Sequence, residues 1–219
     1  MKYIYHHLGL GDHIICNGLV RHLQKQHKKV SVFCKYHNTI NVSYMFRDNE
    51  DIQVIGVNDD EDVINYIQKN KISNELIVVG FNKLSLVEHK RFDEGFYKSV
   101  DLPFSYRFEK FYVERDLDLE NKILDELNPK KEKYIFVHGV DLSRVRKDFK
   151  IIQNPIQYNI FNLISLIENS EEVHLMESSL KNLVNSYKME KPNFFYHQYS
   201  RNYPEYNNTQ GLNNFEIIN

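Results

Sequence analysis

A glycine turn that ends in a carboxylate is the part of the sequence best suited to chemistry. Gly9-Leu10-Gly11-Asp12 separates a short aromatic and β-branched run from a pattern with one apolar helical face. Because glycine has no Cβ, Gly9 and Gly11 can take positive φ values or let a ligand or another backbone come close. Asp12 is predicted to cap the helix with its carboxylate, to act as a general base for a hydroxyl group, or to do both.

A second group of polar residues follows the predicted strand that ends at His138. Arg144, Arg146 and Lys147 place three cations within four residues. Such a cluster suits a diphosphate, whose charge must be neutralised as it departs as a leaving group. The alternative is a solvated basic loop with no ligand.

The turn Glu177-Ser178-Ser179 opens a later predicted helix. The first turn of a helix has unpaired N–H groups, which can bind phosphate oxygens. Ser178 and Ser179 would lie beside that phosphate, and Glu177 could accept hydrogen bonds from ribose hydroxyls. The alternative is that the serines only cap the helix.

The sequence lacks the spacings typical of metal and dinucleotide sites. It has ten histidines but no HExxH motif, and its cysteines, Cys16 and Cys34, form no CxxC pair. The glycine turn is neither a Walker A loop nor GxGxxG, which disfavours a nucleotide-sugar epimerase. We therefore expect no metal, no cofactor and two buried free thiols.

These polar residues are placed by alternating strand and helix patterns. In the first half, one strand is predicted to begin at residue 3, and three more are predicted over 29–34, 51–57 and 76–80. Helices are predicted after residue 12, over 38–46 and over 59–70. In the second half, strands are predicted over 133–138, 172–176 and 193–196, and helices over 117–127, 160–167 and 180–185. Alternation at this spacing is typical of parallel, right-handed α/β sheets.

The second half repeats the pattern of the first, so we expect two Rossmann-like halves that face a cleft. The predicted domains are residues 1–115 and 116–200. Residues 201–219 are polar and rich in Asn and Tyr. They are predicted to be a tail that wraps the surface or returns to the first domain.

Residues 92–112 interrupt the alternation with many aromatic and charged side chains. One interpretation is a surface helix and a loop held by aromatic anchors. The other is a substrate-facing insertion, in which Tyr97 is an aromatic platform and Arg107 binds a sugar or an anion.

Charge and hydropathy exclude some classes of protein. The 28 basic and 30 acidic residues nearly balance, so no electrostatic argument supports nucleic-acid binding. No apolar run reaches the length of a membrane span and no signal-peptide core begins the chain, so we expect a cytoplasmic protein. Peripheral membrane contact stays open, and the sequence does not determine the oligomeric state.

The motifs together resemble the GT-B glycosyltransferases, of the heptosyltransferase-like and fucosyltransferase-like kinds. The segment from His7 to Asp12 is similar to their N-terminal glycine loop, which ends in the acid that deprotonates the acceptor. The strand ending at His138, followed by Arg144 and Arg146, resembles their donor-side His/Arg motif. Glu177-Ser178-Ser179 resembles the turn that holds ribose and pyrophosphate, although Leu180-Lys181-Asn182 replaces the usual His-Leu.

The resemblance implies a metal-independent, inverting glycosyltransferase that transfers a sugar from a nucleotide-diphosphate sugar to a glycan such as capsule or lipopolysaccharide. Asp12 would be the base, and Gly9, Gly11, His13, Tyr97 and Arg107 would form the acceptor and phosphate loop. The donor would bind residues of the second half, listed here: His138, Arg144, Arg146, Lys147, Glu177, Ser178 and Ser179. The alternative is a non-catalytic nucleotide-sugar-binding module or a degenerate transferase subunit.

Overall fold

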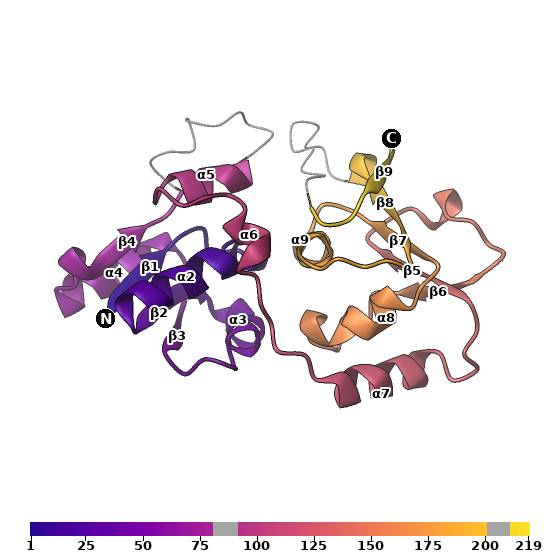
Figure 1. Cartoon of the computed structure of the whole chain (residues 1–219), viewed down its shortest axis with the longest axis horizontal. Coiled ribbons are helices and arrows are strands. Elements are labelled where there is room, and N and C mark those ends of the chain that lie inside the picture. Colours follow the sequence, from indigo (N-terminus) through magenta and orange to yellow (C-terminus); the bar gives the residue numbers. More distant parts are fainter. Residues whose placement is uncertain (81–91, 201–210) are drawn as a thin grey trace. The chain divides into compact units, whose positions relative to one another are not determined.

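A computed structural model of the chain describes residues 1–80, 92–200 and 211–219. The chain divides into two compact units, Met1–Glu114 and Arg115–Asn219 (Figure 1). Each unit has its own parallel sheet and its own core, and each is described below by itself.

The first unit is built on strands β1 to β4 and the helices that connect them. Their bounds are β1 Lys2–Tyr5, α1 Leu10–Ile15, α2 Asn17–His27, β2 Val30–Lys35, η1 Tyr36–Asn38, α3 Thr39–Met45, β3 Ile52–Val57, α4 Asp60–Asn70, η2 Ser73–Glu75 and β4 Leu76–Val78. Two further helices follow, α5 Phe92–Lys98 and α6 Tyr106–Glu109. The strand order is β3-β2-β1-β4 and every pairing is parallel, so the carboxyl ends of the strands share one edge.

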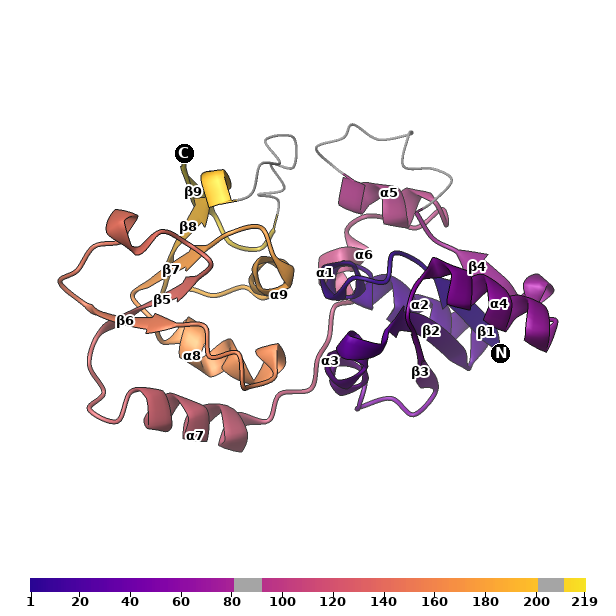
Figure 2. The same cartoon turned by 180° about the vertical axis from the view of Figure 1, so that it is seen from behind.

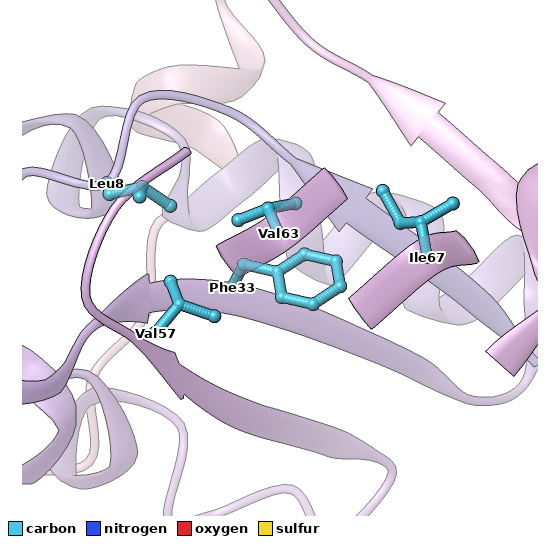
Figure 3. Packing of buried hydrophobic residues seen from close by; sticks show 5 residues of the cluster. All are labelled: Leu8, Phe33, Val57, Val63 and Ile67. Carbon is cyan, nitrogen blue, oxygen red and sulfur yellow. The ribbon is translucent and has the colours of Figure 1, made fainter. Parts of the chain in front are cut away.

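One face of this sheet is covered by α4. Val63 and Ile67 of α4 pack against Phe33 of β2, together with Val57 and Leu8 (Figure 3). The helix forms here because Asp59 caps it, accepting from the N–H groups of Glu61 and Asp62, and three acidic residues occupy its first turn. On the opposite face, core side chains such as Ile4 and Val32 are completely buried.

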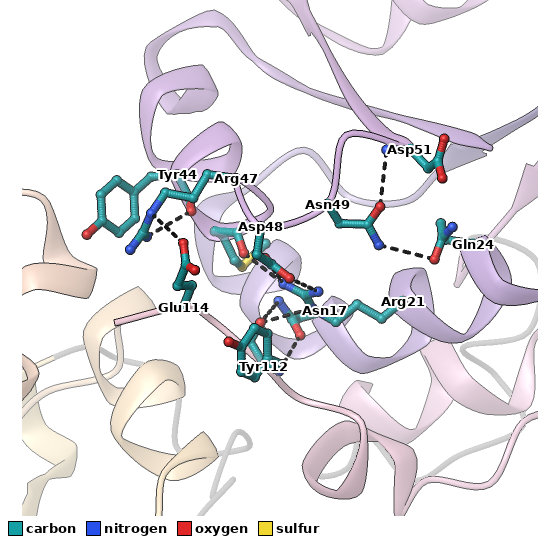
Figure 4. Close-up of polar contacts among 11 residues, drawn as sticks. Asn17, Arg21, Gln24, Tyr44, Arg47, Asp48, Asn49, Asp51, Tyr112 and Glu114 are labelled. Atoms are coloured by element: carbon teal, nitrogen blue, oxygen red, sulfur yellow. Dashed lines mark hydrogen bonds and ion pairs between the residues drawn. The ribbon is translucent and has the colours of Figure 1, made fainter. Parts of the chain in front are cut away.

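A polar network fixes the last residues of the first unit (Figure 4). The Arg21 guanidinium of α2 donates to both carboxylate oxygens of Asp48, at 2.8 and 2.7 Å, and to the Tyr112 carbonyl at 3.0 Å. The Asn17 amide pairs with the backbone of Tyr112 in both directions, at 3.0 and 3.1 Å. Residues 111–113 are therefore held against α2, and Arg21 has a structural role.

The second unit contains the other parallel sheet. Its elements are α7 Leu117–Leu127, β5 Tyr134–His138, η5 Leu142–Arg144, β6 Lys150–Gln153, η6 Ile160–Leu163, α8 Ile164–Glu168, β7 Glu172–Leu175, α9 Ser179–Ser186, β8 Asn193–His197, η7 Gln198–Ser200 and β9 Phe215–Ile218. The strand order is β6-β5-β7-β8-β9, again with every pairing parallel.

The two faces of this sheet are covered differently. Helices α8 and α9 lie on one side, and the segment from 139 to 149 lies on the other (Figures 1 and 2). That segment is anchored by Val145, which is 3% exposed and packs with Ile135 and Val137 of β5. The second unit is thus a sheet with helices on one face and a long loop on the other.

Two strands of the second sheet differ from the sequence prediction. Lys150–Gln153 form β6, where no strand was predicted. Phe215–Ile218 form β9, which pairs with β8 of the same unit. The prediction that the end of the chain is a tail on the surface or on the first domain is therefore wrong for these four residues. Residues 201–210 lie outside the described part of the chain.

The α/β class and the two parallel sheets predicted from the sequence are confirmed. Cys16 and Cys34 are buried free thiols, as expected. Among the residues that the structure describes, no helix is both long and apolar enough to cross a membrane.

Candidate functional site

Asp12 lies beyond the carboxyl end of β1, at the edge where parallel sheets bind ligands. Gly9, with φ −73° and ψ 146°, is the N-cap of α1, and Asp12 is the third residue of the helix. The prediction that Asp12 is the N-cap is therefore wrong, because the helix begins at Leu10, three residues before the start at His13 that an Asp12 cap would give. A Cβ on Gly9 would lie 2.8 Å from Asp12 Oδ2, so the glycine provides the space that the carboxylate occupies.

Burial raises the pKa of the Asp12 carboxyl to about 7. Loss of hydration disfavours the charged form, and no neighbouring charge within the described residues compensates for it. A carboxylate with a pKa near the working pH is well matched to accept a proton. Asp12 is only partly buried by surface area, so its carboxyl group can reach a ligand.

The imidazoles beneath this turn are part of the core. His6 and His13 are 0% and 1% exposed, and their ring centroids are 4.4 Å apart. Burial lowers the pKa of His6 to about 4 and lowers that of His13 well below its ordinary value, so both rings are neutral. The prediction that His13 contacts an acceptor or a phosphate is wrong, because its ring is enclosed.

Tyr97 and Arg107 are also buried, although they were predicted to face a substrate. The Tyr97 hydroxyl donates to the Ile15 carbonyl at 2.7 Å, which ties α5 to the end of α1. The Arg107 guanidinium is 0% exposed and forms an ion pair with Asp93, which is 2% exposed. A charge without hydration requires such a partner, so both residues hold α5 and α6 in place rather than bind an acceptor.

The second unit brings several predicted site residues to the carboxyl edge of its sheet. His138 ends β5, and its Nδ1 lies 3.1 Å from Nδ2 of Asn154, which follows β6. The His138 carbonyl accepts from the N–H of Met176, which follows β7, at 3.2 Å. Gly139 has φ +68°, and a Cβ there would lie 2.4 Å from the Met176 sulfur. His138 and the turn at Glu177 are therefore neighbours.

Glu177 is held by a buried lysine that sequence reasoning missed. Lys181, at 0% exposure, donates from Nζ to Glu177 Oε2 at 2.6 Å. Its ammonium also lies 3.9 Å from the centroid of the Tyr196 ring, and the Tyr196 hydroxyl is 3.4 Å from the same carboxylate oxygen. The signal in the sequence was an acid just before the helix with a lysine four residues later, in its first turn.

The serines of this turn open α9. Ser178 is the N-cap, and its hydroxyl accepts from the Lys181 N–H at 3.3 Å, while Ser179 is the first helical residue. The capping role of Ser178 is confirmed. The N–H groups of the first turn, beginning with Ser179, point out of this helix end, as phosphate binding there would require.

The three predicted cations are placed differently from one another. The exposed Arg144 guanidinium lies 4.2 Å from the centroid of the Tyr199 ring, just beyond the carboxyl end of β8, and donates to the Asn219 carbonyl. Arg146 instead forms ion pairs with Asp148 and, at 3.1 Å, with Glu172 at the amino end of β7. Arg146 is therefore away from the edge where His138 lies, and its prediction as a donor ligand is wrong. Lys147 is exposed.

Sequence reasoning also missed His174, His197 and Tyr199, which lie hydrogen-bonded in a row beside Arg144. The two strands were visible in the sequence, but the contact of His174 on β7 with His197 on β8 was not, and Tyr199 lies in η7, beyond the strand. Among residues 1–80, 92–200 and 211–219, no three His, Cys, Asp or Glu side chains form a group that could hold a metal ion.

Comparison with known proteins identifies related folds. No family model and no curated protein matches the sequence. Among solved structures, a glycosyl transferase family 9 protein of Veillonella parvula DSM 2008 matches with a TM-score of 0.55 at 7% identity, covering 99% of this chain and 85% of that chain. ADP-heptose LPS heptosyltransferase II of E. coli matches with a TM-score of 0.57 at 9% identity, covering 100% and 90%.

These likenesses extend over both units and agree with the two parallel α/β sheets described above. Identities this low show the fold and nothing finer. The resemblance to heptosyltransferase-like enzymes that the motifs suggested is thus confirmed at the level of structure. The chain has the α/β architecture of the GT-B glycosyltransferases.

Proposed function

We propose that this protein is a glycosyltransferase that moves a sugar from a nucleotide-diphosphate sugar to a hydroxyl group of a glycan. The observation that carries the proposal is Asp12: a partly exposed carboxyl group with a pKa raised to about 7, at the carboxyl edge of a parallel sheet, in a fold shared with glycosyltransferases. The resemblance to GT-B glycosyltransferases implies capsule or lipopolysaccharide as the class of acceptor.

Asp12 would act as the general base. As the acceptor oxygen attacks the anomeric carbon, its proton passes to the Asp12 carboxylate. The bond between the anomeric carbon and the phosphate oxygen breaks, and its electron pair leaves with the nucleoside diphosphate. Attack on the face opposite the leaving group inverts the configuration at that carbon. A base that is ionised only above about pH 7 predicts turnover that rises with pH through that range.

The second unit would bind the donor. Arg144 would neutralise the diphosphate as it leaves, and the first-turn N–H groups of α9 at Ser179 would bind its oxygens. His138 and Glu177 border the same edge, where Glu177 is suited to the ribose. Because these groups supply positive charge and donors, the proposal includes transfer without a metal ion.

Nucleotide binding tests the donor site. The thermal stability of the protein is measured with UDP, GDP, ADP, CMP and dTDP, each with magnesium and with EDTA. A ligand that binds only the folded state raises Tm, so we expect one nucleotide to raise it by several degrees whether or not magnesium is present. ADP has a particular place in the panel because one structural neighbour is named for ADP-heptose. No shift with any nucleotide would contradict the donor site.

Two arginine variants sharpen this test. Arg144→Gln should weaken binding of the preferred nucleotide about tenfold or more, since a charge-assisted contact is lost. Arg47→Gln is the matched control, because Arg47 also lies over a tyrosine ring, 3.8 Å from the centroid of Tyr44, and pairs with Glu114 in the first unit, so its variant should bind almost as tightly as the wild type. Equal losses in both variants would indicate a diffuse basic surface instead of a site.

A non-catalytic nucleotide-sugar-binding module is the second candidate. It is favoured by the departure of the second-unit motif from that of the transferases, since Leu180-Lys181-Asn182 stands where the usual His-Leu is expected and Lys181 is buried against Glu177. This candidate predicts the same nucleotide shift without release of nucleoside diphosphate from any sugar nucleotide, in the presence or absence of glycans.

A further inference from the structure

A chain of hydrogen bonds runs across the loop-covered face of the second sheet. Glu172 Oε2 lies 3.1 Å from His174 Nε2, and His174 Nδ1 lies 2.8 Å from His197 Nε2. His197 Nδ1 lies 2.9 Å from the Tyr199 hydroxyl, which accepts from the Asp141 N–H at 3.2 Å. Glu172, His174 and His197 are 7%, 4% and 0% exposed, so these three members are shielded from solvent, while Tyr199 is half-buried.

The chemistry of the groups fixes the direction of every bond in this chain. The Glu172 carboxylate only accepts, so His174 donates from Nε2 and a neutral His174 then accepts at Nδ1. His197 must donate from Nε2 to that atom and accept at Nδ1, which leaves the Tyr199 hydroxyl as the donor to His197. Burial lowers the pKa of both imidazoles, consistent with neutral rings.

The negative charge of Glu172, at one end of this chain of hydrogen bonds, is balanced by an arginine. Glu172 accepts at Oε1 from Arg146, at 3.1 Å, and Arg146 in turn pairs with Asp148. A buried polar chain in which every member has its partner defines one geometry, whereas a partly satisfied chain would not. Arg146 therefore has a use in the structure that does not involve a ligand.

The other end of the chain holds the loop that carries Arg144. The Tyr199 hydroxyl binds the backbone of Asp141, and the Tyr199 ring is the platform under the Arg144 guanidinium, 4.2 Å from its centroid. The same loop is anchored at β5 through Val145. The loop is thus held by apolar contacts at one strand and by the polar chain at two others.

We propose that the chain from Glu172 through His174 and His197 to Tyr199 is a positioning device that fixes the Arg144 guanidinium for the diphosphate of the donor. The proposal rests on the donor site described above. An exposed arginine loses side-chain freedom when it binds a phosphate, and a rigid aromatic platform reduces that loss. His174, His197 and Tyr199 are positioning residues, since they act through Arg144.

The chain itself is tested by NMR of the protein labelled with ¹⁵N-histidine. The wild type should show both His174 and His197 as neutral rings with the proton on Nε2. In Tyr199→Phe, the ¹⁵N signal of His197 Nδ1 should move, because that atom loses its donor, while His174 changes little. A proton on Nδ1 of His197, or an unchanged Nδ1 signal in Tyr199→Phe, would overturn the proposed chain.

Its effect on binding is tested with inorganic pyrophosphate by titration calorimetry. Tyr199→Phe keeps the ring and removes the hydroxyl, and should weaken binding about tenfold. Tyr158→Phe is the control, because the Tyr158 hydroxyl donates to Glu126 at 2.7 Å and takes no part in this row of hydrogen bonds. His197→Leu should behave like Tyr199→Phe, whereas His197→Gln, which can both donate and accept, should restore most of the affinity.

The outcomes separate the two proposals. If Arg144→Gln loses pyrophosphate binding but Tyr199→Phe and His197→Leu bind as the wild type does, the donor site stands and the positioning role is overturned. If Arg144→Gln also binds as the wild type does, the donor site fails and the positioning role fails with it. In either case the NMR measurement shows whether the hydrogen bonds from His174 through His197 to Tyr199 have the proposed directions.

Discussion

At the scale of single residues, the carboxyl group of Asp12 illustrates a conflict between stability and activity. Its pKa is about 7 in the folded chain and about 4 when unfolded, because burial removes its hydration. Between these values the folded state binds the extra proton, so its stability falls as pH rises through this range. Active sites commonly contain a group whose ionised form is needed for the reaction but lowers the stability of the folded protein.

Asp12→Asn should therefore stabilise the protein at high pH. At about pH 8.5 we expect the free energy of unfolding to rise by about 1 kcal/mol, after allowance for the partial exposure of the carboxyl group. At about pH 4 the difference should vanish, because the folded wild type is then protonated. Urea unfolding at both values measures this. An equal effect at the two pH values would contradict the raised pKa.

The buried ion pair beside the proposed ribose site gives a second prediction. Lys181→Met removes a cation that is 0% exposed and leaves Glu177 without its partner, and should cost about 2 kcal/mol. Lys191→Met is the control, because Lys191 pairs with Glu171 at the surface and should cost less than about 0.5 kcal/mol. Adding Glu177→Gln to Lys181→Met should restore stability, because no unpaired carboxylate is left. If the double variant stays as unstable as Lys181→Met, the loss comes from packing and not from the unpaired charge.

The positions of Asp12, His138 and Glu177 near the carboxyl ends of strands were predictable from the sequence, because each ends or follows a recognisable strand. It could not show that Tyr97 and Arg107 are enclosed. Their environment depends on partners from other elements, such as Ile15 in α1, and an aromatic or basic side chain in a polar stretch has the same pattern whether it faces a ligand or the core.

At the scale of elements, the packing of α2 on α6 depends on a glycine. A Cβ on Gly18 would lie 2.0 Å from the Tyr106 carbonyl oxygen. The backbones of the two helices therefore come into contact at a position that has no side chain. Gly18→Ala should destabilise the protein by about 2 kcal/mol or more, despite the better helix propensity of alanine. Thermal unfolding measures the loss.

Gly56→Ala is the matched control for that change. A Cβ on Gly56 would meet the Tyr36 ring at 2.6 Å and the Thr39 methyl at 2.9 Å, and Tyr36 is 61% exposed and free to move. We expect a cost below about 1 kcal/mol, since a flexible side chain yields more easily than a helix backbone. A loss as large as that of Gly18→Ala would show that the α2–α6 approach is not the more rigid contact.

Most elements were predictable from hydrophobic periodicity, and the exceptions have a common cause. β6 and β9 have four residues each and lie at the two edges of the second sheet. Length alone is not the cause, because β7 also has four residues and was predicted. All four residues of β7 are buried, whereas β6 and β9 are edge strands with mostly exposed or partly exposed side chains. Such strands are defined by pairing with β5 and β8 rather than by their own pattern.

At the scale of the whole molecule, neutral histidines in both units should make the protein sensitive to acid. Burial lowers the pKa of His6 and His197 to about 4, whereas an unfolded histidine binds a proton below about pH 6.5. Between these values the unfolded chain binds more protons, so stability should fall as pH falls.

The loss of stability caused by the histidines should be measured in the Asp12→Asn variant, because protonation of Asp12 raises stability as pH falls over the same range. We expect a loss of about 2 kcal/mol between about pH 7 and pH 5 in urea unfolding. Replacing His6 or His197 by Gln should reduce the dependence. A profile independent of pH would contradict the neutral buried rings.

The architecture of the molecule was predictable because strand and helix patterns recur in both halves, and the confirmed α/β fold follows from that recurrence. The assignment of acceptor and donor to the first and second units stays a prediction. It depends on ligands, which neither periodicity nor the packing of the two sheets identifies.

Turnover by the wild type and by Asp12→Asn tests the central claim most directly. The sugar nucleotide whose nucleotide raises Tm most is incubated with a panel of glycan acceptors, and release of nucleoside diphosphate is followed together with nucleotide affinity. We predict release by the wild type, rising with pH through about 7, and loss of at least about a hundredfold in Asp12→Asn with nucleotide affinity unchanged. Release by Asp12→Asn at the rate of the wild type would contradict the assignment of Asp12 as the base.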